Sequence, residues 1–580
     1  MEQEDVAKTE LQQKIQNKDP SVSLSELFGN ESGTSGLKRH TCKAATPTGN
    51  QTKVTAFIKR KLPGGVKTRV ARKIARFCCK DLRPFAVVEG AGFVSVVQEL
   101  LDIGSQYGGA VRAEDLLPCA RTVSRHVDGE YQKSKALVVE DLKQCTNYAV
   151  TTDLWTEEKT NTHYITVTVH YITVNWEMVN RILATKEMVG VKSGAHIRIT
   201  VEEILQEFGI QSPNNVFVTD NGSNVVSAFK DYVRLSCAGH NINLALKYVF
   251  DNLEDDNPRH SPVIKLLHES KTLVSHFKRA GLQNELDQTL KQAVETRWNS
   301  KLLMLRSIND ALKSGKLHRV LLARRELRFL NNIDSELLED IIKLLTPFDE
   351  ATRHLSADKT PTLHLVLPTK ATLLKGLLIQ ADDSAIMKEL KGKLTQAVEL
   401  KFIVQLYHKV ATALSPSLRS FLRKTLSAQE YEEVINTLAA FMTTGTEERV
   451  RDHADTAEEE EGTPPVSERG TTEVHNFFSS CVEEEETEAH SDEEGTSCRK
   501  FVLDYMLQNN SKMTRGESLL GFWKEMSGGL VAVAKKMLAI PATSTPSERS
   551  FSVAGRLIEE RRTSLDPDNV NAILFLHSNI

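Results

Sequence analysis

Two short β-branched runs, each ending in an aspartate, constrain the fold of this chain more than any other feature of its sequence. The run Y-A-V-T-T-D covers residues 148–153, and N-V-F-V-T-D covers residues 215–220. Runs of this length and composition are typical of buried strands that present a side chain at their end. We therefore predict two strands, one ending at Asp153 and the other at Asp220.

The β signal between these two runs predicts a mixed sheet. Residues 164–173 and 178–188 have the composition of two further strands, and a helix is predicted at about 200–208, before the strand at 215–220. Three antiparallel strands, a helix and a strand that enters between parallel neighbours describe half of a ribonuclease-H-like sheet. The predicted fold class is therefore α/β. In that topology the first and fourth strands are adjacent.

Adjacent strands would bring the carboxylates of Asp153 and Asp220 within a few ångströms of each other. Like charges at that separation repel unless a cation lies between them, and Mg²⁺ prefers oxygen ligands. The alternative is that each aspartate caps a helix or a turn, since Asn221-Gly222-Ser223 directly after Asp220 is a competent turn and N-cap. The residues alone leave both interpretations open.

A third acidic residue, Glu548, stands in the run I-P-A-T-S-T-P-S-E-R-S-F-S-V-A-G at residues 540–555. It lies between two Ser/Thr-rich turns, and a helix is expected to begin near it. Three carboxylates brought together can hold two divalent cations for phosphodiester chemistry.

The rest of the chain is predicted to be mainly helical. With 580 residues, 40% hydrophobic and 6% aromatic, the chain exceeds one ordinary core and suits several domains rich in helix. Long helical periodicity runs from about 261 to 446. One apolar face there is expected to contain Leu337, Leu338, Ile341, Ile342, Leu344 and Leu345.

The charge is distributed asymmetrically along the chain. Residues 51–80 contain ten Lys or Arg and no acidic residue, whereas residues 452–498 contain sixteen Asp or Glu and one Arg. A basic arm and an acidic block indicate a nucleic-acid partner and a disordered tether, although both could be solvated surfaces. The basic residues expected to contact DNA are Lys59, Arg60, Lys61, Arg72 and Lys73.

Composition also excludes some classes of protein. No run of eighteen apolar residues occurs, and the first residues, M-E-Q-E-D-V-A-K, lack a signal-peptide core. We therefore expect an intracellular protein without a membrane partner. The eight cysteines show no framework spacing, which is consistent with reduced thiols.

Six motifs in order give the chain a family resemblance. It resembles hAT-superfamily DNA transposases of the kind related to BED-finger proteins, over about residues 80–580. The motifs are D-L-R-P-F-A-V-V-E-G-A-G-F (81–93), T-T-D-L-W-T (151–156), V-T-D-N-G-S-N (218–224), C-A-G-H-N-I-N-L (237–244), E-T-R-W-N-S (295–300) and A-T-S-T-P-S-E-R-S-F-S-V-A-G (542–555).

The resemblance implies a ribonuclease-H-like catalytic domain that a large all-helical insertion interrupts, together with a helical N-terminal domain. Asp153, Asp220 and Glu548 match the D-D-E triad of the family, with Mg²⁺ or Mn²⁺ as the implied cofactor. The expected segments are 1–50 (disordered tail), 51–145 (basic, DNA-binding-like), 146–255 (catalytic domain, first part), 256–450 (helical insertion), 451–498 (acidic linker) and 499–580 (catalytic domain, second part, with the dimerisation region).

Other motif residues carry implied roles beside open alternatives. Cys237 and His240 would support the active site, and a zinc site there is not expected because no second ligand pair stands nearby. Trp155 and Trp298, the latter next to Arg297, could stack on a displaced base or simply pack in a core. Arg549 could contact a phosphate or pair with an acid.

The N-terminal region departs from the family pattern. Residues 33–42 resemble the closing half of a BED zinc finger, with His40 and Cys42 as remnants of a ligand set, but no cysteine precedes them. Two ligands do not close a tetrahedral zinc site, so zinc is not expected. The basic arm could still bind double-stranded DNA in a salt-sensitive way.

The sequence leaves competing functions. The first is cut-and-paste transposition by a nuclear homodimer or higher oligomer, in which residues 556–576 match the family's dimerisation region. Val570, Ile573, Leu574 and Leu576 there could dimerise or pack on their own chain. The second is a domesticated nuclear protein that binds DNA, dimerises and regulates transcription without catalysis. A third, with only composition behind it, is a nuclear scaffold acting through the acidic block.

Overall fold

The computed structural model describes most of the chain beyond residue 62. The described residues are 63–108, 111–145, 147–157, 161–211, 215–256, 261–294, 298–449, 477–478, 497–508, 518–558 and 565–579. Outside them fall the tail 1–50, nearly all of the acidic linker, and the candidate residues His40, Cys42, Lys59, Arg60, Lys61 and Arg297. The chain divides into two compact units, residues 1–117 and 118–580.

The described part of the first unit is helical, as predicted for the N-terminal region. It contains α4 (Gly64–Lys80), η2 (Phe85–Glu89), α5 (Ala91–Tyr107) and α6 (Ala113–Leu116). Pro63 precedes α4, and the Phe77 and Phe93 rings stack at 6.3 Å between α4 and α5. The basic side chains of α4, which include Arg72 and Lys73, are exposed.

A five-stranded mixed sheet forms the centre of the second unit. Its strands are β1 (Ala149–Glu157), β2 (Thr162–Ile172), β3 (Met178–Glu187), β4 (Val216–Thr219) and β5 (Val233–Ser236). The order across the sheet is β3-β2-β1-β4-β5. The pairs β1–β2 and β2–β3 are antiparallel, whereas β1–β4 and β4–β5 are parallel. The predicted adjacency of the first and fourth strands is confirmed.

Two details of the sheet differ from the sequence prediction. Asp153 does not end its strand, because antiparallel pairing with β2 extends β1 to Glu157. The strand β5 was not predicted at all. It has only four residues, between α9 (Ser223–Ala228) and α10 (Ala238–Asp256), and so short a run carries little periodic signal.

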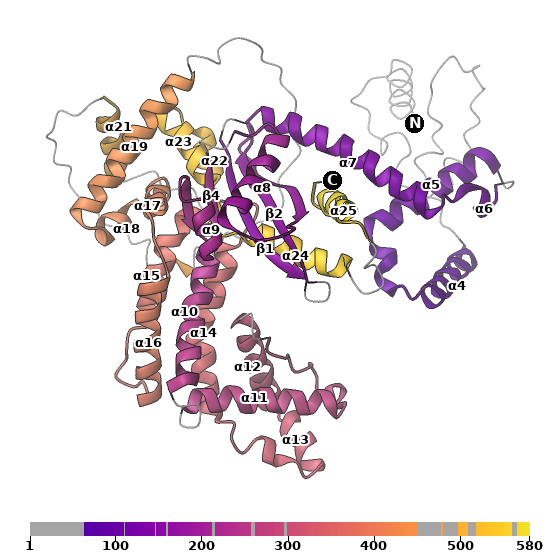
Figure 1. Cartoon of the computed structure of the whole chain (residues 1–580). Coiled ribbons are helices and arrows are strands. Elements are labelled where there is room, and N and C mark those ends of the chain that lie inside the picture. The colour runs from indigo at the N-terminus through magenta and orange to yellow at the C-terminus, as the bar shows by residue number, and fades with distance from the viewer. Residues whose placement is uncertain are drawn as a thin grey trace, which may run out of the picture. The chain divides into compact units, whose positions relative to one another are not determined.

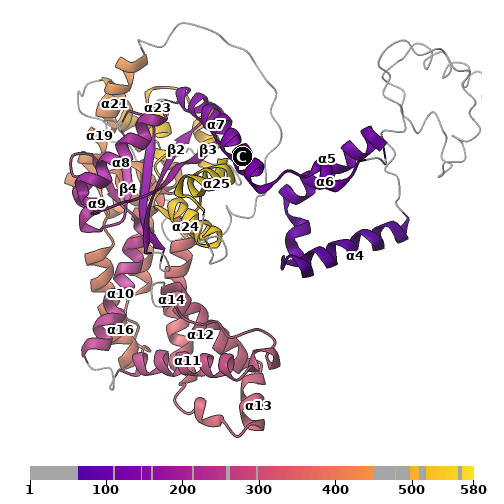
Figure 2. The same ribbon diagram turned by 45° about the vertical axis from the view of Figure 1, so that its right-hand side comes forward.

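Helices cover both faces of the sheet, and the alternation of side chains along the strands decides which core each residue joins. On one face Val150, Val167 and Phe217 pack with residues of α7 (Ala120–Lys143) and α8 (Gly194–Glu207). On the other face, Ala149, Val216 and Val218 pack with residues of four helices: α17 (Leu406–Ala413), α19 (Ala428–Arg449), α22 (Leu519–Glu525) and α23 (Gly529–Leu538). Figures 1 and 2 show the strands between these two helical layers.

In sequence order, a long run of helices follows the last strand and α10 and precedes the C-terminal helices. It is here called the helical region (residues 262–449). The helices α10 and α14 extend from the sheet, and α11, α12 and α13 gather at their far end (Figures 1 and 2). The members are α11 (Pro262–Arg279), α12 (Trp298–Lys313), α13 (Lys316–Ala323), α14 (Ser335–Leu355), α15 (Val366–Gly376), α16 (Ala385–Lys401), α17 (Leu406–Ala413), α18 (Arg419–Thr425) and α19 (Ala428–Arg449).

Helix α14 bears out the predicted apolar face. Its buried residues include Leu337, Leu338, Ile341, Leu344 and Leu345, while Ile342 is partly buried against the same core. The Asp334 side chain accepts hydrogen bonds from two backbone N–H groups at the start of the helix, which satisfies donors that have no intrahelical partner.

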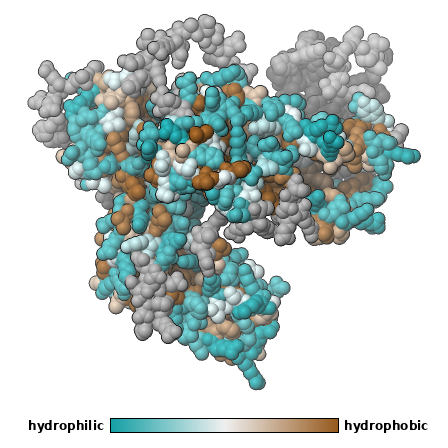
Figure 3. Space-filling model, in the orientation of Figure 1, coloured by the Kyte–Doolittle hydropathy of each residue, from teal (hydrophilic) through white to brown (hydrophobic). Residues whose placement is uncertain are grey.

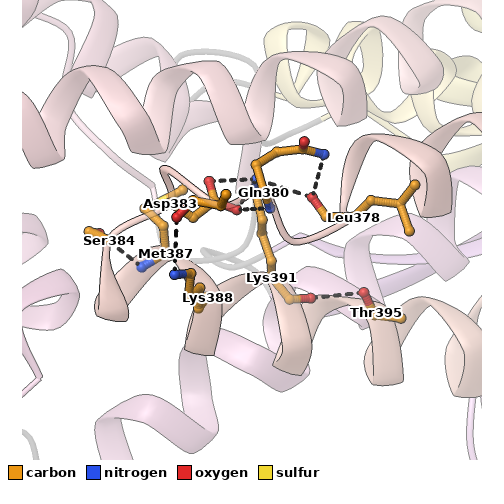
Figure 4. A network of polar contacts seen from close by, with 9 residues as sticks. Leu378, Gln380, Asp383, Ser384, Met387, Lys388, Lys391 and Thr395 are labelled. Carbon is orange, nitrogen blue, oxygen red and sulfur yellow. Dashed lines mark hydrogen bonds and ion pairs between the residues drawn. The ribbon is translucent and has the colours of Figure 1, made fainter.

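The turn between α15 and α16 is closed by a nearly buried ion pair (Figure 4). The Lys391 ammonium donates to both carboxylate oxygens of Asp383, at 2.7 and 2.6 Å, and to the Leu378 carbonyl at 3.3 Å. These bonds from Lys391, with the backbone N–H of Gln380, hold the pKa of Asp383 below its usual value. The network fixes a tight connection in the helical region.

The surface of the molecule carries mixed polarity. The face in Figure 3 is mostly hydrophilic, with separate hydrophobic patches. Among the described helices, none combines the length and the apolar character that a membrane crossing requires.

The C-terminal helices return to the sheet. They are α21 (Ser497–Leu507), α22 (Leu519–Glu525), α23 (Gly529–Leu538), α24 (Thr545–Leu557) and α25 (Pro567–Asn579). Val570, Leu574 and Phe575 of α25 are buried within their own chain, and the Phe575 ring meets Tyr131 of α7 edge-on at 5.0 Å. Packing on the same chain, one of the two alternatives for this helix, is therefore observed.

We predict that Phe575→Ala lowers the free energy of unfolding by about 3–5 kcal/mol, because the fully buried ring would leave a cavity among α7, α8 and α25. Urea denaturation monitored by circular dichroism measures this loss. Phe501→Ala is the control, since that ring is 44% exposed and its removal should cost much less. Equal losses in the two variants would contradict the packing of α25 described here.

Candidate active site

Parallel pairing of β1 with β4 places the two predicted aspartates side by side. The register pairs Ala149 with Val216 and Thr151 with Val218. Two residues further along both strands are Asp153 and Asp220, which therefore stand opposite each other and point to the same face of the sheet. That face is the one covered by α24, because Thr151 contacts α24 directly.

The helix α24 lies on the sheet through hydroxyl groups. The Ser547 hydroxyl bonds with Thr151 on β1 at 3.1 Å and with Thr168 on β2 at 3.3 Å. One helical turn later, the Ser550 hydroxyl lies 3.4 Å from that of Thr185 on β3. Glu548 directly follows the buried Ser547 in the first turn of the helix, so the third predicted carboxylate is held at the same face as the aspartates.

The electrostatics of Asp153 link the three carboxylates. Burial, and after it the negative charges of Glu548 and Asp220, together raise the pKa of Asp153 to about 8. A carboxylate whose ionised form is this unfavourable lies in a site that favours added positive charge. The donor set consists of carboxylate oxygens, the ligands that suit Mg²⁺ or Mn²⁺.

The carboxylates do not by themselves form a closed metal cage. Within the part of the chain that the structure describes, no three His, Cys, Asp or Glu side chains converge as a ready-made metal-binding group. The fit of a divalent cation therefore rests on the chemistry of the donors and on the raised pKa of Asp153.

A buried layer of hydroxyls beneath α24 was missed by the sequence analysis. Thr151, Thr166, Thr168 and Thr185 on the sheet are all nearly inaccessible to solvent, and His170 beside them has its pKa lowered to about 3 by burial. His170 is thus neutral and bonds with the Thr151 hydroxyl at 3.0 Å. The alternating threonines of the strands carry this signal, because a β-branched residue that faces the core also brings a hydroxyl there.

Cys237 connects the strand that carries Asp220 to the loop before α24. Its backbone N–H donates to the Thr219 carbonyl at 2.8 Å, and its sulfur accepts from the Ser544 backbone N–H at 3.3 Å. Complete burial raises the pKa of the Cys237 thiol to about 11, so the sulfur stays protonated. His240 is half-buried one turn further along α10. The geometry of Cys237 suits the supporting role expected for this motif.

Arg234 on β5 is a neighbour of Asp220 that sequence reasoning did not find. Its guanidinium donates to the Asp220 backbone carbonyl at 2.8 Å, to the Thr219 hydroxyl at 3.0 Å and to the Asn221 side-chain oxygen at 3.2 Å. Burial lowers the pKa of Arg234, and the charge of Asp220 partly opposes that shift. Because β5 itself was not predicted, no pattern placed Arg234 near the carboxylates.

Arg549 pairs with an acid in this structure, one of its two predicted possibilities. The guanidinium forms an ion pair with Asp358 and donates to the Ser356 carbonyl at 2.7 Å. Both partners follow the last turn of α14, so the residue after Glu548 is tied to the helical region.

The two candidate tryptophans occupy different surroundings. Trp155 is half-buried on β1, two residues beyond Asp153, and its ring stacks on Tyr164 and on Phe551, each at 5.7 Å. Trp298 is 8% exposed and belongs to the core of the helical region. That burial favours the packing alternative for Trp298 over base stacking.

Comparison with known proteins shows which families this chain is similar to. Three family models match in chain order: the Hermes transposase DNA-binding domain (residues 61–122), the ZBED1 RNase-like domain (151–242) and the hAT family C-terminal dimerisation region (503–580). The second contains Asp153 and Asp220, and the third contains Glu548. Over these three segments the chain is therefore similar to hAT transposases and to BED-type proteins.

Individual relatives agree with this assignment. The Hobo transposase of Drosophila melanogaster is 27% identical over 66% of this chain and 58% of the relative. Human zinc finger protein 618 is 23% identical over 90% of this chain and 52% of the relative. Human zinc finger BED domain-containing protein 6 is 24% identical over 74% of this chain and 48% of the relative. The chain thus spans about half the length of the curated relatives it matches.

The raised pKa of Asp153 predicts a pH-dependent effect of Asp153→Asn on stability without metal. The folded-state pKa of about 8 exceeds the reference value of 3.8, so the contribution of Asp153 to the stability of the wild-type protein is fully present below pH 3.8 and is lost as the pH rises to 8. Asp153→Asn removes this loss. Between pH 5.5 and 8 the variant should therefore gain up to about 3 kcal/mol relative to the wild type.

Urea denaturation in EDTA at several pH values measures this gain. The exposed Asp128→Asn is the matched control, since it removes one carboxylate far from the candidate site. A difference between wild type and Asp153→Asn that stays constant with pH would refute the electrostatic description of the site.

Proposed function

We propose that this chain is a hAT-type transposase that cleaves and joins DNA strands with a divalent cation held by Asp153, Asp220 and Glu548. The observation that carries the proposal is the paired register of β1 and β4, which sets two aspartates side by side under the helix that contains Glu548. The charges of both Asp220 and Glu548 raise the pKa of Asp153, which supports a grouping of three carboxylates from distant parts of the chain near one face of the sheet. Such convergence suits metal-dependent phosphodiester chemistry.

The proposed architecture is a ribonuclease-H-like domain that the helical region interrupts as an insertion. The sheet order β3-β2-β1-β4-β5, with three antiparallel strands followed by two parallel ones, supports this interpretation. The C-terminal helices that follow the helical region complete the same domain, because α24 and α25 pack on strands formed some 400 residues earlier. Glu548 reaches the site only through this return of the chain.

The cofactor proposed for the site is Mg²⁺ or Mn²⁺. When bound, such cations activate the attacking oxygen and stabilise the leaving oxygen of an in-line phosphoryl displacement. The chain itself provides two half-buried carboxylates, Asp153 and Asp220, and the exposed carboxylate of Glu548. The proposed role of Trp155, two residues beyond Asp153 on the same strand face, is to stack on a base that leaves the duplex near the cleavage point.

We predict that the purified protein nicks DNA carrying the matching terminal repeat in the presence of Mg²⁺, and that Asp153→Asn lowers the rate by at least about 100-fold. Gel analysis of end-labelled DNA measures the nicking. The control is again Asp128→Asn, which leaves the carboxylates intact. Equal rates for wild type and Asp153→Asn would disprove the triad.

The basic helix α4 is the proposed DNA-contacting element among the described residues. It carries no acidic residue, and its exposed Arg72 and Lys73 stand next to each other in the chain, within the segment that matches the Hermes DNA-binding domain. Contacts to phosphates would give binding that weakens as salt rises.

Arg72→Ala and Lys73→Ala should each weaken binding to all duplex sequences alike and reduce the slope of log K against log salt by about 1, because each removes one phosphate contact. Fluorescence anisotropy at several salt concentrations measures both quantities. The exposed Lys133→Ala on α7 is the control, since it removes one positive charge outside the proposed DNA-binding unit. An unchanged salt slope in both α4 variants would remove α4 from the interface.

A second function is favoured by the range of relatives. Zinc finger protein 618 matches 90% of this chain, a larger share than Hobo transposase does. We therefore keep the alternative of a nuclear, dimeric DNA-binding regulator that has kept the fold without catalysis. Salt-sensitive DNA binding together with no metal-dependent nicking would establish this alternative; homodimerisation through residues 503–580 is proposed for both functions.

A further inference from the structure

We propose that the helical region positions two of the three carboxylates through two separate sets of hydrogen bonds, one leading to Asp220 and the other to Glu548. The proposal rests on the proposed function, since it concerns how the same site is assembled. It gives the helical region a task beyond that of a spacer between the two parts of the α/β domain.

The first contact set, here called the Gln405 contact, joins the start of α17 to the edge strand β5. The Gln405 side-chain N–H donates to the Arg234 carbonyl at 2.8 Å, and its side-chain oxygen accepts from the Ser236 backbone N–H at 2.9 Å. The amide thus pairs with β5 as the backbone of a further strand would. The Gln405 backbone N–H in turn donates to His408 at 2.8 Å, which fixes the first turn of α17.

Strand β5 transmits this contact to Asp220. The Arg234 side chain holds the Asp220 carbonyl and the Thr219 hydroxyl, and the Ser236 hydroxyl bonds with the Asn221 side chain at 2.9 Å. Asp220 follows a strand of only four residues, so the ladder alone restrains it weakly. Its position therefore depends on β5, whose free edge the Gln405 contact occupies.

The second contact set, here called the α14 contact, joins the end of α14 to the segment that carries Glu548. Arg549 forms its ion pair with Asp358 and donates to the Ser356 carbonyl. The Thr545 hydroxyl bonds with that of Ser356 at 3.1 Å, and the Thr543 hydroxyl donates to the Leu355 carbonyl at 3.4 Å. The positive Arg549 also meets the C-terminal, partially negative end of α14.

Asp153 provides the contrast. It lies inside the nine-residue strand β1, and the antiparallel pairing with β2 continues through Asp153 to Glu157, so the sheet itself fixes its backbone. Asp220 and Glu548 stand outside regular strands. The helical region touches the elements that hold these two residues, which is why we assign positioning to it.

An exposed ion pair contributes little to global stability, so the effect of Arg549 should appear in the geometry of the site and not in the melting temperature. Displacement of a ligand by about 1 Å can cost about 100-fold in a reaction, and loss of a supporting contact lowers metal affinity by about 10–100-fold. Metal affinity is therefore the quantity that separates positioning from general packing.

The test measures Mn²⁺ binding to the full-length chain by isothermal titration calorimetry. Arg549→Met and Gln405→Leu should each weaken Mn²⁺ binding about 10-fold, with DNA affinity unchanged. Arg556→Met is the matched control, because this exposed arginine lies on the same helix and bonds only within it, to the Ser552 carbonyl, among the contacts described. Arg549→Lys should recover part of the affinity, since it keeps the charge near Asp358.

A double-mutant cycle with Asp358→Asn keeps the test decisive if a single variant folds poorly. Combined with Arg549→Met, this substitution should weaken Mn²⁺ binding no further than Arg549→Met alone, because both remove the same ion pair. Additive losses, or Mn²⁺ affinities equal to the wild type in both Arg549→Met and Gln405→Leu, would overturn the positioning role.

The two proposals fail in different ways. Wild-type protein that binds Mn²⁺ in an Asp153-dependent manner but nicks no DNA would refute the proposed function, while the variants would still test the positioning role. Wild-type protein that nicks DNA, with unaltered metal binding in the variants, would refute the positioning role alone. Wild-type protein that binds no Mn²⁺ would refute both.

Discussion

The parallel pairing of β1 with β4 is the constraint on which the candidate site depends. It sets Asp153 opposite Asp220, and burial, the charge of Glu548 and the charge of Asp220 together raise the pKa of Asp153 to about 8. No local feature of either strand would create that repulsion alone. The fold therefore holds an electrostatically unfavourable cluster in place, as proteins do at functional sites, where local cost is offset by the rest of the structure.

The helix that carries Glu548 meets this cluster through hydrogen bonds more than through apolar packing. Ser547 and Ser550 contact threonines of three strands, and only further along the helix does Phe551 pack against Trp155. Buried hydroxyls have directional partners, so they specify one angular position of a helix on a sheet more narrowly than aliphatic contacts would. A helix that must deliver one carboxylate to a fixed place benefits from that directionality.

The sequence predicted four of the five strands, most helices and the pairing of the first and fourth strands, because long periodic runs and strand-end aspartates carry strong local signals. It did not predict β5, Arg234 or the Gln405 contact, since a four-residue strand has no period and a glutamine at a helix start looks like any polar residue. It also ended β1 at Asp153, because the pairing that extends the strand comes from β2. The missed features all depend on tertiary contacts.

The helical region supplies contacts that the sequence did not predict, and these contacts give a reason for the long separation of Glu548 from the aspartates in the chain. The contacts that hold Asp220 and Glu548 come from Gln405 and from residues 355–358, both within the helical region. In a chain without the helical region, the helix that carries the third carboxylate would follow soon after β5. That helix would then lack the contacts from residues 355–358. The large helical region is therefore more than a spacer between the two parts of the α/β domain. Its two contact sets, the Gln405 contact and the α14 contact, lie where the sheet itself provides the least restraint.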